Sequence, residues 1–217
     1  GKINTSSRQL LGLINDILDM SRMEQGKVVL NNKKLDLRRC VEECTEAFRY
    51  QAEQEGKTLQ TQLELENRYV MGDPFRITQI LNNLLSNAFK FTGTGDAICV
   101  SVTQLDSGEY AKYKFVVSDT GIGMSQDFLP HLFEPYSRET RFSAKQTVGT
   151  GLGMPITKNL VSQMNGEIQV QSELGKGTSF TIVLPLAAAE GPQPAATPRE
   201  KRGGEQPADL EGRRILL

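Results

Sequence analysis

Tryptophan is absent from the 217-residue chain, and histidine and cysteine are scarce, with one and three copies. The one histidine is His131. Two of the cysteines, Cys40 and Cys44, stand four residues apart on a predicted helix, and Cys99 falls in a predicted strand. A zinc site usually needs four such ligands at short spacings. The one histidine is far from the cysteines in sequence, which argues against zinc and favours buried free thiols.

The chain also lacks a charge of one sign and a long apolar run. Its 25 basic and 26 acidic residues give a net charge of -1, so nothing favours nucleic acid or an anionic membrane as a partner. No run approaches the roughly 18–20 apolar residues of a membrane span, and no signal peptide is visible. We expect a cytoplasmic domain, and the sequence leaves open whether the parent protein is membrane-anchored.

The hydrophobic fraction of 38% is enough for a packed core. Hydrophobic periodicity predicts helices over 36–54, 73–91 and 154–164, strands at 28–30, 57–66, 98–102 and 113–117, and a hairpin over 168–186 with its turn at 175–177. Asp36 and Asp73-Pro74 would begin the first two helices as N-caps. This pattern predicts an α+β fold, a two-layer sandwich in which helices cover a mainly antiparallel mixed sheet.

Three further segments flank this domain, which we place at residues 27–186. Residues 1–26 contain a heptad-like apolar stripe, including Ile14, that needs a partner helix. Residues 187–212 are rich in Ala, Pro, Gly and charge and predict a flexible linker. Residues 213–217, RRILL, read as the start of an apolar strand.

A polar stripe on the predicted helix 73–91 carries the first chemical signal. Asn83, Asn87, Lys90 and Phe91 follow one another at offsets of four, seven and eight residues, beside an apolar face. Asn is a poor helix former, so two in mid-helix suggest a ligand. An amide oxygen can bind Mg²⁺ and a lysine can neutralise phosphate. Taken alone, the stripe is more simply a solvated helix face.

Two loop segments add to this signal. In SDTGIGM, Asp119 ends a predicted strand beside Gly121 and Gly123, where a carboxylate could bind an exocyclic amine of a ligand. The alternative is a tight turn capped by aspartate. FEPYSR at 133–138, with the polar segment to Gln146, predicts a mobile lid.

Alternating glycines at 149, 151 and 153 form the segment TVGTGLGM. No GK[ST] follows, so it is not a P-loop, and no apolar strand precedes it, as a dinucleotide-binding fold requires. What remains is a glycine-rich loop that leads into a helix N-terminus, where free N–H groups and the helix dipole favour a phosphate.

These four segments, in this order, resemble the ATP-binding domain of sensor histidine kinases, within the wider family shared with gyrase-type and chaperone ATPases. NLLSNAFKFT looks like the N box of that family, DTGIGM its first glycine box, FEPYSR its F box and GTGLGM its second glycine box. The resemblance covers about residues 73–186. LLGLINDILDMSRMEQGK is similar to the second helix of the dimerisation stem, and RRILL resembles the first strand of a receiver domain, which suggests a hybrid kinase.

The resemblance implies a role for each matching position in binding ATP with Mg²⁺. Asn87 would bind the metal with Asn83 nearby, Lys90 would approach the phosphates, and Arg138 would contact a phosphate from the lid. The partners implied are a second copy through the stem helices and a receiver domain in the same chain, a separate response regulator, or both.

The resemblance also implies how the base is held. Phe91 would pack on the adenine, and Asp119 would accept a hydrogen bond from its exocyclic amine. The residues expected to shape the pocket and the lid hinge are Gly121, Gly123, Gly149, Thr150, Gly151, Leu152 and Gly153.

Two departures from the family limit the expected chemistry. Gyrase-like ATPases usually carry a Glu four residues before the metal-binding Asn, and this chain has Asn83 there, so efficient hydrolysis is not expected. The histidine that accepts the phosphate, followed by an acidic residue, is also missing. His131 reads as a solvated loop residue, so we expect Mg·ATP binding without autophosphorylation.

The sequence is also compatible with two other functions. One is a nucleotide-responsive binding module or pseudokinase without phosphotransfer. The other is a protein Ser/Thr kinase or anti-sigma factor of the same fold.

Overall fold

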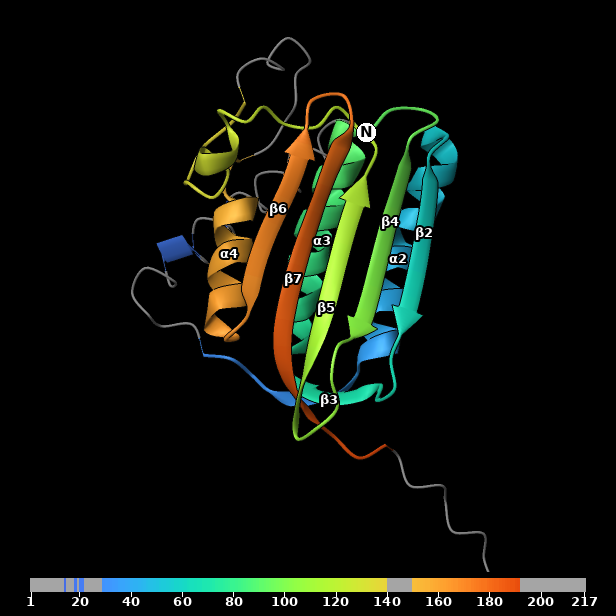
Figure 1. Cartoon of the computed structure of the whole chain (residues 1–217), viewed down its shortest axis with the longest axis vertical. Helices are drawn as coiled ribbons and strands as arrows, with labels where there is room; N and C mark the ends of the chain where they lie inside the picture. The colour runs from blue at the N-terminus through green and yellow to red at the C-terminus, as the bar shows by residue number, and fades with distance from the viewer. Residues whose placement is uncertain (1–13, 15–17, 19, 22–28, 140–149, 192–217) are drawn as a thin grey trace, which may run out of the picture.

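The computed structural model describes residues 14, 18, 20–21, 29–139 and 150–191. A seven-stranded mixed sheet forms one layer, and three helices cover one of its faces (Figure 1). The strands are β1 (Lys33–Asp36), β2 (Thr58–Glu64), β3 (Tyr69–Gly72), β4 (Ala97–Gln104), β5 (Tyr110–Asp119), β6 (Glu167–Glu173) and β7 (Gly177–Ala188). The helices are α2 (Leu37–Glu55), α3 (Pro74–Phe91) and α4 (Gly153–Gln163), with a short 3-10 helix, η1 (Leu129–His131).

The sheet has the order β1-β3-β7-β5-β4-β2, with β6 also paired to β7. Only β2 and β4 pair in parallel, and every other pairing is antiparallel. The expected α+β sandwich with a mainly antiparallel mixed sheet is therefore confirmed.

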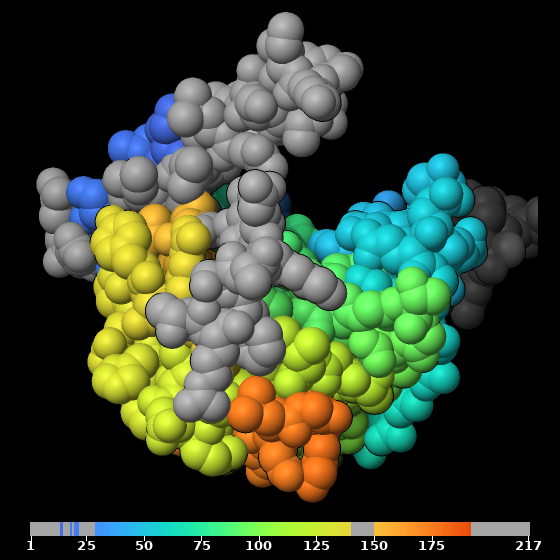
Figure 2. All heavy atoms as spheres, turned by 90° about the horizontal axis from the view of Figure 1, so that it is seen from above, coloured from blue at the N-terminus to red at the C-terminus, as the bar shows by residue number. Residues whose placement is uncertain are grey.

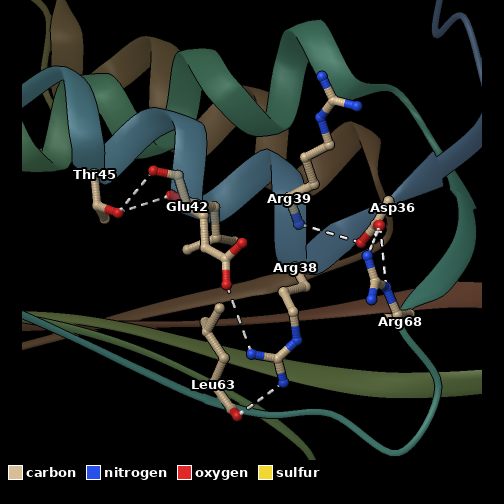
Figure 3. Close-up of polar contacts among 8 residues, drawn as sticks. Asp36, Arg38, Arg39, Glu42, Thr45, Leu63 and Arg68 are labelled. Carbon is tan, nitrogen blue, oxygen red and sulfur yellow. Dashed lines mark hydrogen bonds and ion pairs between the residues drawn. The ribbon is translucent and has the colours of Figure 1, made fainter.

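Side chains cap the N-termini of α2 and α3, as the sequence predicts. Asp36 accepts a hydrogen bond from the Arg39 N–H at 3.2 Å and pairs with Arg68 (Figure 3). Asp73 accepts from the N–H groups of Phe75 and Arg76, and Pro74 occupies the first helical position. These caps satisfy N–H groups that no helical carbonyl can reach.

The core lies between the helices and the covered face of the sheet. It is built from the apolar stripe of α3, the inward residues of the central strands and one face of α4. Cys44 is buried in it, whereas Cys40 and Cys99 are half-buried, and all three are free thiols.

Two details of the strands differ from the sequence-based prediction. Residues 29 and 30 are not in a strand, and Val29 is 85% exposed; the strand begins four residues later, at Lys33. The short strand β3 was not expected. β1 and β3 pair with each other, and this register buries the pair Leu35 and Val70. That burial explains why the strand forms here and not at the more apolar residues 28–30.

Several expectations fall outside the described residues, namely most of the expected stem, the lid from residue 140 on, Gly149, the linker after residue 191 and the last strand. The described stem residues Ile14 and Leu18 are helical and 45% and 49% exposed. Among the described helices, none has the length and apolarity that would let it cross a bilayer.

Candidate functional site

The polar stripe of α3 lies beside its buried face. Ile80, Leu84 and Ala88 are buried, while Asn83, Asn87 and Lys90 are half-buried. Residues three and four apart on a helix share a face, so the three polar side chains form one row. Their partial burial distinguishes them from the exposed Asn82 and Ser86 on the same helix.

Lys90 lies at the C-terminal end of this row. Its ammonium is 4.8 Å from the centroid of the Phe91 ring. Burial lowers the pKa of Lys90, and the positive charge of Arg138 lowers it further. The structure therefore brings Arg138, from the predicted lid, within electrostatic range of the α3 stripe.

Asp119 ends β5 in a partly buried position. Its carboxylate accepts the Gly121 N–H at 2.9 Å. Burial raises the pKa of Asp119, the N–H groups of Gly121 and Thr178 lower it, Asp96 raises it, and the net shift is upward. Burial thus destabilises the charged form of this carboxyl group, and a hydrogen bond from an amine of a ligand would offset that cost.

Close backbone approaches fix the loop after Asp119. The Ile122 N–H donates to the Phe91 carbonyl at 3.1 Å, which joins this loop to the end of α3. A Cβ on Gly121 would lie 2.2 Å from the Phe91 oxygen, and one on Gly123 would lie 2.0 Å from the Glu173 oxygen. These contacts require glycine at both positions.

Gly177 belongs to the same cluster, and the sequence reasoning missed it. A Cβ there would lie 1.9 Å from the Asp119 carbonyl oxygen, and its φ is +96°. Its only sequence signal is GKG in a hairpin, which predicts a turn and not a contact with Asp119.

The second glycine loop joins the F-box segment to α4. Gly151 has a φ of +72°, and its carbonyl accepts the Tyr136 N–H at 3.1 Å. The Leu152 N–H donates to the Thr150 hydroxyl at 3.0 Å. No described side chain caps the N-terminus of α4, and Pro155 lacks an N–H. The N–H groups of Gly153 and Met154 therefore have no intrahelical acceptor.

Asn83 connects this loop to α3. Its amide nitrogen donates to the Gly153 carbonyl and to the Thr157 hydroxyl, each at 3.2 Å. The N-terminal end of the α3 stripe thus lies against the first turn of α4.

The metal expected from the sequence must be judged from its ligands. Among the residues described, no three His, Cys, Asp or Glu side chains gather into a metal cluster. Mg²⁺ is commonly held by one or two protein oxygens together with substrate phosphates and water. The half-buried Asn87 amide, which forms no hydrogen bond with any described residue, fits that mode of binding.

All these segments gather at one end of the domain. Figure 2 looks onto this end, where the end of α3, the segment after β5 and the β6–β7 turn meet. Hydrogen bonds join α3 to the first glycine loop and to α4, and the charge of Arg138 lowers the pKa of Lys90 on the same helix. Gly149 lies outside the described residues; the other sequence-predicted site residues all belong to this end.

Comparison with known proteins gives this arrangement a family. The profile of the family described as "Histidine kinase-, DNA gyrase B-, and HSP90-like ATPase" matches residues 72–188, more than half of the chain. The chain belongs to this family.

Its relatives within the family are sensor kinases. Sensor protein GacS of Pseudomonas syringae is 38% identical over 190 residues, 87% of this chain and 21% of GacS. LuxQ of Vibrio parahaemolyticus, an autoinducer 2 sensor kinase/phosphatase, is 34% identical over 98% of this chain and 25% of LuxQ. Hybrid signal transduction histidine kinase L of Dictyostelium discoideum is 37% identical over 84% of this chain and 11% of its own length.

A solved structure agrees with these sequences. Full-length ShkA in complex with AMPPNP has a TM-score of 0.74 and 29% identity over 87% of this chain and 38% of ShkA. Within the ATPase family, this chain is the ATP-binding catalytic domain of a two-component sensor histidine kinase. It spans a quarter or less of the length of these curated relatives.

Proposed function

We propose that this domain binds Mg·ATP and transfers the γ-phosphate to a histidine on a stem helix, for relay to a receiver aspartate. One observation carries the proposal. Asn83 of the α3 stripe lies against the N-terminus of α4, which no described side chain caps, and the loop after Asp119 is bonded to the C-terminal end of α3. Metal, phosphate and base contacts are thus available at one end of one domain.

The phosphate half of the site would use charge and positioning. Asn87 would hold Mg²⁺, which supplies neutralisation of the phosphate charge when it is bound. Lys90 would add positive charge, and so would Arg138, whose charge lowers the pKa of Lys90. The free N–H groups at the start of α4 suit an anion. Phosphoryl transfer depends mainly on such positioning and electrostatic stabilisation.

The base half would use Phe91 and Asp119. Phe91 is half-buried at the end of α3, where an adenine could stack on its ring, and Asp119 would accept the exocyclic amine. The residues that would shape the pocket and the lid hinge are Gly121, Gly123, Gly149, Thr150, Gly151, Leu152 and Gly153.

The remaining assignments rest on the sequence and its relatives. We propose that residues 1–26 belong to a dimerisation stem, 27–186 to the catalytic domain, 187–212 to a linker and 213–217 to a receiver domain. The partners would be a second copy through the stem and a receiver in the same chain, a separate response regulator, or both.

Calorimetry with ATP tests the binding step. We expect the domain to bind ATP more tightly with Mg²⁺ than without it, and Asn87→Ala to remove that difference. Asn82→Ala is the matched control, because Asn82 is exposed on the same helix. No ATP binding in the presence of Mg²⁺ would contradict the proposal.

Transfer needs a second experiment. A longer copy of the chain with the stem histidine and the Asn87→Ala change is incubated with this domain and labelled ATP. Label on the longer copy supports transfer. ATP binding without label would favour the binding module or pseudokinase instead.

A further inference from the structure

Asn83, the first residue of the N box, contacts Thr157, which lies outside the four family motifs. The two residues are 74 residues apart in sequence, on α3 and α4. The Asn83 amide nitrogen lies 3.2 Å from the Thr157 hydroxyl and also 3.2 Å from the Gly153 carbonyl oxygen. Gly153 and Thr157 are one turn apart on α4, so a single amide group spans its first turn.

Thr157 is fully buried, and its helix neighbours Ile156 and Leu160 are buried core residues. An apolar residue of the same shape would fill this position without desolvating a hydroxyl. The hydroxyl therefore needs a polar partner, and the Asn83 amide supplies one. This pairing makes Thr157 more than a space-filling core residue.

The contact lies between the two groups that the proposed function uses on the phosphates. Asn87 is one turn further along α3 on the same stripe, and Gly153 begins the helix whose first N–H groups have no acceptor among the described residues. Any rotation or sliding of α4 against α3 would stretch both hydrogen bonds of Asn83. The pair therefore sets the position of the free N–H groups relative to Asn87.

We propose that Asn83 and Thr157 act as a positioning clamp for the phosphate half of the site. Asn83 then acts on the nucleotide through α4, and Thr157 is a positioning residue outside the glycine box. This inference rests on the proposed function. It also explains what an asparagine does at the position where gyrase-like ATPases carry a glutamate.

Thr157→Val and Thr157→Ser form a matched pair of variants. Val keeps the shape and removes the acceptor, whereas Ser keeps the acceptor and removes a methyl group. We expect Thr157→Val to weaken ATP binding by about three- to tenfold, the loss of one hydrogen bond. Thr157→Ser should stay within about twofold of the wild type. Adenosine, which has no phosphates, should bind wild type and Thr157→Val equally by NMR titration.

The result that overturns the clamp is an ATP affinity unchanged in Thr157→Val, or a loss shared equally by adenosine and ATP. A double-mutant cycle with Asn83→Ala decides the route. If Asn83 acts through Thr157, the double variant should lose much less ATP-binding free energy than the sum of the losses in the two single variants. Additive losses would mean that Asn83 acts independently of Thr157 and would also overturn the clamp. Failure of wild type to bind ATP would instead contradict the proposed function.

Discussion

Asp119 shows how a residue proposed to bind the adenine can oppose the stability of its own fold. Its pKa is raised above the ordinary value of 3.8, with burial as the main cause. A carboxyl group whose pKa is raised in the folded state destabilises that state when it is ionised. Its ionisation therefore lowers stability as pH rises through 3.8 and the folded-state pKa, and the full effect is present at neutral pH.

Asp119→Asn should separate stability from binding. The variant should be more stable than wild type at pH 7, and this gain should disappear below about pH 4, where wild type is also neutral. Its ATP affinity should fall by about tenfold or more, since an amide replaces a charged acceptor. Thermal unfolding across pH and calorimetry check the two parts. Lower stability at pH 7 would contradict the burial argument.

Glycine substitutions should separate steric contact from backbone strain. Gly123 has a φ of +65° and would place a Cβ 2.0 Å from the Glu173 oxygen, whereas Gly175 has a φ of +77° and open space around it. Gly175→Ala should cost about 1 kcal/mol from strain alone. Gly123→Ala should cost about 3 kcal/mol or more. Denaturant unfolding measures both, and equal losses would show that the backbone contact is not needed.

At the scale of elements, the polar contacts around the start of α2 and the edge strand β2 fix how this helix lies on the sheet. Asp36 caps the helix and pairs with Arg68, and a guanidinium nitrogen of Arg38 donates to the Leu63 carbonyl at 3.3 Å (Figure 3). Because β2 lies at the edge of the sheet, the Arg38 hydrogen bond ties an edge strand to the helix that covers it.

The Asp36–Arg68 pair predicts a pH-dependent contribution to stability. The hydrogen bond from Arg68 holds the pKa of Asp36 below its usual 3.8. The contribution is therefore complete above pH 3.8 and is lost as pH falls through the lowered folded-state pKa. Asp36→Asn, which can still cap the helix, should lower the free energy of unfolding by about 0.2–1 kcal/mol at pH 7 and leave it unchanged at low pH. Arg68→Gln should give the same profile in thermal unfolding, and a loss that persists in acid would contradict it.

The elements themselves follow well from local sequence. Asp73-Pro74 predicts the start of α3 because cap and first-turn geometry depend on adjacent residues. β1 was misplaced because its position depends on pairing with β3, and Leu35 becomes buried only in that register. The sequence predicts that Gly121 and Gly123 shape a pocket, but the backbone atoms that they approach, in Phe91 and Glu173, belong to other elements. The Asn83–Thr157 contact depends in the same way on how two helices pack, which no local pattern encodes.

At the scale of the whole molecule, the proposed ATP site draws on segments from residue 87 to residue 153, and bound ATP would hold them together. A ligand that binds only the folded state stabilises it by mass action, by about 2.7 kcal/mol at one hundred times its Kd. We therefore expect Mg·ATP to raise the melting temperature and to slow amide exchange at Ile122 and Gly175, which are joined by a hydrogen bond. Asn87→Ala should need more ATP for the same shift. A shift in melting temperature that is the same with and without Mg²⁺ would contradict the proposed metal role.

The chain as a whole should bind ATP without phosphorylating itself. Its one histidine, His131, is exposed in η1, and its Nδ1 lies 3.0 Å from a Glu134 carboxylate oxygen. It is on the same chain segment as the F box, whereas the proposed acceptor belongs to a stem helix. Labelled ATP should therefore leave no acid-labile phosphate on this chain. If label does appear, its loss in His131→Asn would identify His131 as the acceptor and would contradict transfer to a stem histidine as the sole reaction.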